Sequence, residues 1–247
     1  MIPKIIHYCW LSNDTIPENM KKWMSTWKKL NGYEFILWNF DRFDINSSIW
    51  VKQAFNAKKY AFAADYIRAF ALYNYGGIYM DMDVEVIKSF DELLCEDYLI
   101  AYESPLGIEG GILGSAKGCP IFKNILDYYK DKTFINKDGS FNTNPALPGI
   151  ISKVLRDNYV IRNDYINKTP FDGKVVYIYP WFYFTSRNYP FREIEVKNES
   201  FTIHHFAGSW YKEAKWKSLI KTILGKRITK SIISFKHIFD SNKDYSN

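Results

Sequence analysis

The sequence predicts an α/β fold in which helices cover the faces of a β-sheet. Three observations lead to this prediction. The chain opens with a strand, a helix and a second strand, and segments of strand and helix spacing continue to alternate as far as residue 206. The chain has 247 residues, enough to bury a sizeable core. Hydrophobic residues make up 47% and charged residues 24%, an ordinary globular composition that excludes disordered and collagen-like classes.

The elements of the first part of the chain follow from its periodicity. The opening residues have the pattern of a strand, and Trp23, Met24 and Trp27 then recur at helical spacing. A long alanine-rich helical pattern ends at Gly76-Gly77, as glycine commonly ends helices. We expect strands over residues 2–10, 33–38 and 78–87, and helices over residues 17–30, 48–56 and 58–75.

The elements of the second part are shorter. Pro120 stands where proline is favoured, in the first turn of a helix. We expect helices over residues 120–129 and 145–157, and strands over residues 97–103, 111–114, 174–179 and 201–206. No internal repeat or linker divides the chain, so residues 1–210 are expected to form one domain and residues 211–247 a tail.

Composition narrows the classes of protein that fit. The three cysteines, Cys9, Cys95 and Cys119, are odd in number and lack a CxxC spacing, which argues against a disulfide scaffold or a zinc ribbon. Aromatic residues reach 18%, which fits either a protein that stacks flat polar ligands or a large aromatic core. The first residues lack the pattern of a signal peptide, and no apolar run approaches the length of a membrane span. We therefore expect a cytoplasmic protein.

The positive charge is concentrated in the tail. Residues 1–210 contain 24 basic and 24 acidic residues, whereas residues 211–247 contain 9 basic and 3 acidic residues and supply the whole net charge of +6. Apolar residues of the tail recur at helical spacing, with lysines on the other faces. Such a basic amphipathic helix either binds the inner face of an anionic membrane, or packs on the protein core with its lysines exposed to solvent. The neutral remainder argues against nucleic-acid binding.

An acidic strand carries the most informative chemistry. If residues 78–87 form one strand, Tyr79, Asp81, Asp83 and Glu85 share one face. Carboxylates that lie so close together repel one another unless a cation neutralises their charge. Oxygen ligands favour Mg²⁺ or Mn²⁺ as this cation. An exposed acidic strand edge is the plain alternative.

Two further groups strengthen the metal interpretation. Asp65 and Arg68 lie three residues apart and project from one helix face. They form either a surface ion pair or a pair that binds sugar hydroxyls or a phosphate. Near the end of the expected domain, His204 and His205 are adjacent in a strand, so only one of them can face the carboxylates. Imidazole is a common metal ligand.

Three blocks of the sequence resemble one family. They are residues 2–10, residues 61–85 with Asp-Tyr-x-Arg, Gly-Gly-Ile-Tyr and Asp-x-Asp in that order, and residues 204–210. The chain resembles the DXD-containing glycosyltransferases, which include bacterial capsular and O-antigen polysaccharide enzymes and fungal mannosyltransferases. The glucosyltransferase domains of clostridial toxins are more distant relatives. The resemblance implies a GT-A fold with a Rossmann-like half, and metal-aided transfer from a nucleotide sugar with retention of configuration.

The resemblance also implies roles for individual residues. Arg68 and Asp65 would hold the donor sugar, with Arg68 near the diphosphate. Asp83 would bind the metal directly, and Asp81 would meet the ribose or sugar and a metal-bound water. By the same resemblance, Tyr8 and Trp10 would contact the nucleotide base, and Tyr79 would lie beside the donor. His205 would be the third ligand of the metal. Ser209 and Trp210 would cover the diphosphate.

These expectations define one function. The chain is expected to be a Mn²⁺- or Mg²⁺-dependent retaining glycosyltransferase that moves a sugar from a nucleotide sugar, with a UDP-sugar favoured, to a lipid-linked saccharide in bacterial capsule or O-antigen synthesis. Front-side displacement is the expected mechanism, with Glu109 as an alternative participant. The alternatives are a toxin-like enzyme that modifies a protein, a haloacid-dehalogenase-like phosphatase and a non-catalytic carbohydrate-binding protein.

Overall fold

The computed structural model describes residues 1–104, 107–188 and 193–207. The expected tail, residues 211–247, lies outside this part of the chain. The described helices are α1 (Glu18–Met24), α2 (Ile49–Asn56), α3 (Tyr60–Tyr75), α4 (Pro120–Tyr129) and α5 (Leu147–Asn158). The described strands are β1 (Ile5–Cys9), β2 (Glu34–Trp38), β3 (Gly77–Met80), β4 (Val84–Val86), β5 (Tyr98–Leu99), β6 (Tyr102–Ser104), β7 (Gly107–Ile108), β8 (Ile112–Ser115), β9 (Val160–Arg162), β10 (Val175–Tyr177) and β11 (Thr202–His204).

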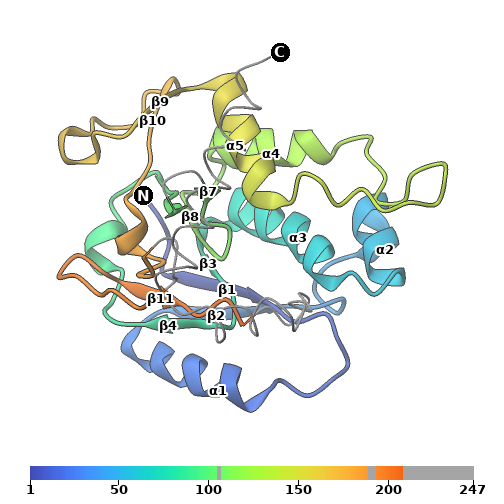
Figure 1. Ribbon diagram of the computed structural model, residues 1–247, viewed down its shortest axis with the longest axis horizontal. Helices are drawn as coiled ribbons and strands as arrows, with labels where there is room; N and C mark the ends of the chain where they lie inside the picture. Colours follow the sequence, from blue (N-terminus) through green and yellow to red (C-terminus); the bar gives the residue numbers. More distant parts are fainter. Residues whose placement is uncertain (105–106, 189–192, 208–247) are drawn as a thin grey trace, which may run out of the picture.

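A central mixed sheet organises the molecule. Its strand order is β2-β1-β3-β8-β5. Strand β1 pairs in parallel with β2 and β3, whereas β8 is antiparallel to both β3 and β5. Figure 1 shows α3, α4 and α5 on one side of this sheet and α1 on the other. The predicted α/β class, with helices on the faces of a sheet, is therefore confirmed.

Two apolar clusters lie on the two faces of the sheet. Alternate residues of each strand enter opposite clusters: Tyr79 packs with the helices α2 to α5, and Ile78 and Met80 pack with α1 and the 3₁₀ turn after it. The largest fully buried side chains are mostly aromatic. The high aromatic content therefore serves the core to a large extent. Among the described helices, none combines the length and apolar character needed to cross a membrane.

Most expected elements are present with shifted ends, but two expected strands are each divided. The expected strand over residues 78–87 is interrupted after β3 by a turn, closed by a hydrogen bond of 3.1 Å from Val84 N to the Asp81 carbonyl, and resumes as β4. Strand β4 leaves the central sheet and pairs with β11 instead. The inference that one strand face aligns the acidic residues is therefore wrong. The expected strand over residues 97–103 is likewise divided, into β5 and β6, and β7 and β9 were not predicted.

Gly76 and Gly77 allow the polypeptide to pass from α3 into the middle of the sheet. Both have positive φ, of 70° and 101°. A Cβ atom on Gly77 would lie 2.7 Å from the Ile5 carbonyl oxygen, so only glycine fits against β1 there. This tight connection places the end of β3 beside the end of β1, at one edge of the sheet.

His7 fixes the same connection through its neutral ring. Its Nδ1 accepts the indole N–H of Trp38 (3.0 Å), so Nε2 carries the proton and donates to the Gly76 carbonyl (2.7 Å). Burial lowers the pKa of His7 to about 4, although the bond to Gly76 acts in the opposite direction.

We expect His7 to make the fold sensitive to mild acid. Because the unfolded chain binds a proton at His7 near pH 6.5 and the folded chain only near pH 4, stability is present above pH 6.5 and is lost as the pH falls through this window. The loss between pH 7 and pH 5 should be about 2 kcal/mol. Urea unfolding at both pH values measures it, and His7→Gln should show a smaller pH effect. An equal effect in both proteins would contradict the assignment.

Candidate active site

Two aspartates are brought together by the turn at the end of β3. Asp81 directly follows β3, and its N–H donates to the Gly111 carbonyl (2.7 Å). Asp83 lies in the turn before β4 and accepts the backbone N–H of Ala207 (2.7 Å). Turn geometry, rather than strand alternation, therefore directs both carboxylates to one place.

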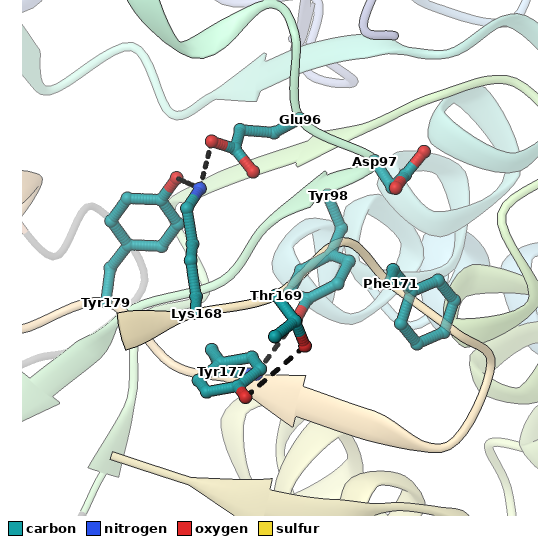
Figure 2. Close-up of a pocket in the computed structure, with 8 residues that line it drawn as sticks. All are labelled: Glu96, Asp97, Tyr98, Lys168, Thr169, Phe171, Tyr177 and Tyr179. Carbon is teal, nitrogen blue, oxygen red and sulfur yellow. Dashed lines mark hydrogen bonds and ion pairs between the residues drawn. The ribbon is translucent and has the colours of Figure 1, made fainter. Parts of the chain in front are cut away.

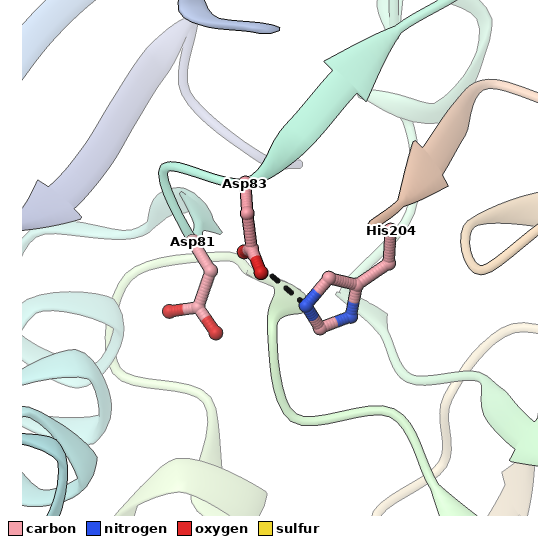
Figure 3. Close-up of side chains that lie close together, drawn as sticks. All are labelled: Asp81, Asp83 and His204. Carbon is pink, nitrogen blue, oxygen red and sulfur yellow. Dashed lines mark ion pairs between the residues drawn. The ribbon is translucent and has the colours of Figure 1, made fainter. Parts of the chain in front are cut away.

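His204 completes this group. One ligand atom from each of Asp81, Asp83 and His204 lies within 4.8 Å of the others, and Figure 3 shows the three side chains converging. The Nε2 atom of His204 is 3.3 Å from Asp83 Oδ1. Two carboxylates and an imidazole form a donor set that suits a divalent cation such as Mn²⁺. The side chains therefore fit the predicted metal site.

The prediction for the third metal-side residue differs from the structure. His205 was the expected ligand, but its ring stacks on Trp23 of α1 at 4.4 Å between centroids. Its Nε2 is 2.9 Å from Glu85 and its Nδ1 is 3.1 Å from Arg187. The physical reason is strand pairing: β11 lies antiparallel to β4 with His204 opposite Val84, which turns His204 toward the aspartates and His205 away.

Arg68 connects the predicted sugar-binding pair to this group. Its Nη2 lies 3.2 Å from Asp65 Oδ1 and 3.4 Å from Asp81 Oδ1, and its Nη1 donates to the Gly110 carbonyl. The guanidinium also lies over the ring of Tyr79, at 4.4 Å from the centroid. Arg68 is only 4% exposed, so this is a buried network and not a surface ion pair.

The remaining contacts of this network define its extent. The Tyr79 hydroxyl donates to Asp81 Oδ1 (2.9 Å), and the Asp65 carboxylate receives the backbone N–H of Leu147 at the start of α5. The Nε of Arg68 is buried and has no partner among the described residues. Helices α3 and α5 and strand β3 thus meet at one charged centre that retains one unused donor.

Burial and charge shift the titration of these groups in different directions. Burial raises the pKa of Asp65 to about 6 despite the opposing effect of Arg68, and it also raises the pKa of Asp81. Burial acts in the same direction on Asp83, but hydrogen bonds from His204 and Ala207 outweigh it and lower the pKa of Asp83. Burial lowers the pKa of His204, but the flanking Glu109 and Asp83 raise it well above its usual range. The group therefore has strong local fields of both signs, as many functional sites do.

The other predicted donor-binding residues are partly placed. Tyr8 is half-buried and meets Trp27 edge to face at 5.4 Å. Trp10 follows β1, so it lies at the same edge of the sheet as Asp81, and its indole N–H donates to the Asp14 carbonyl (2.9 Å). Their nucleotide roles remain predictions. Ser209 and Trp210 lie outside the described residues.

A separate small pocket lies toward the other end of the sheet. Tyr98 is opposite Ser115, which is opposite Gly77 at the start of β3, whereas Asp81 follows the end of that strand. Figure 2 shows that Lys168 in this pocket is already paired with Glu96. The Tyr98 hydroxyl accepts the backbone N–H of Tyr177 at 2.8 Å. These polar groups of the pocket are thus paired with one another. The candidate site is therefore the group formed by Asp81, Asp83 and His204, which is called the aspartate group below.

Gly111 provides a direct steric test of the site. A Cβ atom at this position would lie 2.5 Å from His204 Cε1 and 3.0 Å from Asp81 Oδ2, whereas one on Gly110 would find its nearest neighbour at 3.4 Å. We therefore expect Gly111→Ala to weaken Mn²⁺ binding by about tenfold or more, and Gly110→Ala to leave it nearly unchanged. Isothermal titration with Mn²⁺ measures both. Equal affinities in the two variants would contradict the geometry.

Comparison with known proteins agrees with this site. Residues 16–100 match the family described as "Glycosyltransferase sugar-binding region containing DXD motif". This segment contains Asp65, Arg68 and both aspartates of the turn. Over this segment the chain resembles the DXD-containing glycosyltransferases. The mixed sheet, with Asp81 directly after β3, is the arrangement expected from this resemblance.

Proteins similar to this chain in sequence are found in fungi and in a virus. Inositol phosphoceramide mannosyltransferase 3 of Schizosaccharomyces pombe is 35% identical over 167 residues, covering 63% of this chain and 46% of that protein. An uncharacterized glycosyltransferase of Acanthamoeba polyphaga mimivirus is 27% identical over 209 residues, covering 77% and 78%. The solved structure of the PaToxG glycosyltransferase has a TM-score of 0.48 and 19% identity, covering 63% and 69%. The chain thus spans less than half the length of the fungal relative.

Sequence reasoning chose the wrong histidine and missed one residue of the site. The strand pattern left His204 and His205 as alternatives, and the resemblance favoured His205. Thr185 was not considered, although its hydroxyl donates to Glu109 (2.7 Å) and its carbonyl accepts the N–H of His204 (3.0 Å). Glu109 itself was expected only as an alternative participant in the chemistry, and here it contacts His204.

Proposed function

We propose that this chain is a divalent-metal-dependent, retaining glycosyltransferase that moves a sugar from a nucleoside diphosphate sugar to a hydroxyl group of a lipid-carried acceptor. One observation carries the proposal: the Asp81–Asp83–His204 group adjoins the buried Asp65–Arg68 pair, and the four residues other than His204 lie in the segment that matches the DXD sugar-binding region.

The residues have chemistry that suits cleavage of a sugar–diphosphate bond. This cleavage builds negative charge on the leaving diphosphate, and a divalent cation held by Asp81, Asp83 and His204 would supply neutralising positive charge. Arg68 adds a second positive charge, and its unused Nε can donate to an oxygen of the donor. Asp65, held by Arg68, can accept hydrogen bonds from sugar hydroxyls.

Retention is proposed to occur by front-side displacement. A double displacement needs a carboxylate free to attack the anomeric carbon. Glu109 is not free, because its carboxylate already accepts hydrogen bonds from Gly111, Thr185 and His204. Asp65 is likewise engaged by Arg68 and by the N–H of Leu147. This arrangement supports orientation and charge stabilisation as the main contributions of the protein.

The donor and acceptor are proposed by chemical class. A UDP-sugar is the donor expected from the resemblance to toxin and capsule enzymes, and the mannosyltransferase relative supports GDP-mannose as the competing choice. That relative is named for an inositol phosphoceramide, and the acceptor in bacterial capsule or O-antigen synthesis is also proposed to be lipid-linked. A polar group carried on a lipid is common to both acceptors.

A thermal-shift panel tests the proposal. UDP-, GDP-, ADP-, TDP- and CMP-linked sugars are each added with and without Mn²⁺, because a ligand that binds only the folded chain raises the melting temperature. We expect one nucleoside diphosphate sugar to stabilise the chain only when Mn²⁺ is present. Product analysis with that donor then compares a glycolipid acceptor with a protein acceptor. No shift with any donor would contradict the proposal and favour a phosphatase or a carbohydrate-binding protein.

A further inference from the structure

Glu109 is a buried carboxylate whose oxygens are both occupied. It is 1% exposed. Its Oε1 accepts the N–H of Gly111 (2.7 Å) and faces Nδ1 of His204 (2.9 Å), and its Oε2 accepts the hydroxyl of Thr185 (2.7 Å). We propose that Glu109 is the positioning residue for His204, and that it sets the affinity of the aspartate group for Mn²⁺. This inference rests on the proposed function.

The hydrogen-bond partners determine which nitrogen of His204 is available. An ionised carboxylate can only accept, so the Nδ1 facing Glu109 carries a proton and donates it. The remaining nitrogen, Nε2, points to the aspartates, 3.3 Å from Asp83 Oδ1. A histidine that binds a metal through one nitrogen commonly donates from the other to a carboxylate, which fixes the ring and makes the ligand more basic.

Packing holds the ring in this orientation. Phe206 stacks on His204 with 4.0 Å between ring centroids. The ring also lies directly against the backbone of Gly111, so close that a Cβ atom on this residue would collide with His204 Cε1. Thr185 holds both partners, because its hydroxyl donates to Glu109 and its carbonyl accepts the N–H of His204. Thr185, Glu109 and His204 are therefore linked to one another by direct hydrogen bonds.

This arrangement distinguishes between cations. Mg²⁺ prefers oxygen ligands, so the contribution of a well-oriented imidazole is larger for Mn²⁺. Loss of a residue that orients a metal ligand typically lowers affinity 10- to 100-fold. We expect Glu109→Gln to weaken Mn²⁺ binding by about that factor and to change Mg²⁺ binding less. Glutamine keeps the size of the side chain and one acceptor oxygen, but it removes the charge.

Mn²⁺ titrations followed by electron paramagnetic resonance test the inference. The unmodified chain, Glu109→Gln and the control Glu96→Gln are compared, and Mg²⁺ competition gives the ratio of affinities. Glu96 pairs with Lys168 in the separate pocket, so its variant should bind Mn²⁺ normally. If Glu109→Gln does not fold, Thr185→Val takes its place, with an expected weakening of several-fold, and Thr185→Ser should restore binding.

A spectroscopic signature separates positioning from general destabilisation. The chain has only 4 histidines, so their ring nitrogens can be resolved by ¹⁵N NMR. With the diamagnetic ion Zn²⁺ bound, His204 should carry its proton on Nδ1 in the unmodified chain, and the signal of this proton should be exchange-broadened in Glu109→Gln. A folded Glu109→Gln variant with unchanged Mn²⁺ affinity would overturn the inference alone. Absence of Mn²⁺ binding in the unmodified chain would overturn the proposed function as well.

Discussion

Asp83→Asn should abolish the metal-dependent binding of the nucleotide sugar and lower the rate of sugar transfer by about 100-fold or more, because the ion contributes several kcal/mol of charge stabilisation in such reactions. Asp83 faces His204 and is anchored by the N–H of Ala207, so the substitution removes a charge at the centre of the group without opening a cavity. Mn²⁺ titration and a transfer assay with the donor found in the thermal-shift panel measure the two effects.

The matched control for this prediction is Glu85→Gln. Glu85 lies two residues further along the same segment, but it contacts His205 and not the aspartate group. We expect its variant to keep metal-dependent donor binding. If Asp83→Asn transferred sugar at the rate of Glu85→Gln, the aspartate group would not be the catalytic centre.

Arg68→Met should lower both stability and activity strongly. Asp65 and Asp81 would be left buried without their positive partner, and breaking a buried ion pair in this way costs about 3–5 kcal/mol. Protonation of Asp65, whose pKa is already raised to about 6, will relieve part of this cost near that pH. Loss of the donor to the diphosphate should reduce transfer by about 100- to 1,000-fold.

Urea unfolding at pH 7 measures the stability effect, with Lys153→Met as the control. Lys153 also forms an ion pair, with Asp157 one helical turn away, but its side chain is 53% exposed. Exposed pairs of this kind contribute less than about 1 kcal/mol. Similar losses in the two variants would mean that Arg68 does not neutralise the buried aspartates.

The order of the chemical groups could be read from the sequence. The helical spacing of Asp65 and Arg68, the Gly-Gly break and the Asp-x-Asp pair all lie within one short segment, and local periodicity is sufficient to place them on a helix, a connection and the end of a strand. The helix over residues 120–129 has the predicted ends, and the α/β class follows from the alternation of elements.

The detailed geometry could not be read in this way. The acidic residues were assigned to one strand face, but a turn after Met80 redirects the chain so that Asp81 and Asp83 meet while Glu85 turns to His205. Local periodicity contains no signal for this turn, because it forms when the Gly111 carbonyl accepts the N–H of Asp81 and when β4 finds a partner other than the central sheet.

The sequence by itself indicated the fold class, the family resemblance and the residues of the DXD segment, since these depend on spacing along a continuous stretch of chain. Only the tertiary structure decided that His204 rather than His205 joins the aspartates, and that Glu109 holds it. The reason is that His204 is the last residue of β11 and His205 follows it, and the pairing of β11 with β4, far away in the sequence, decides which of the two meets the site.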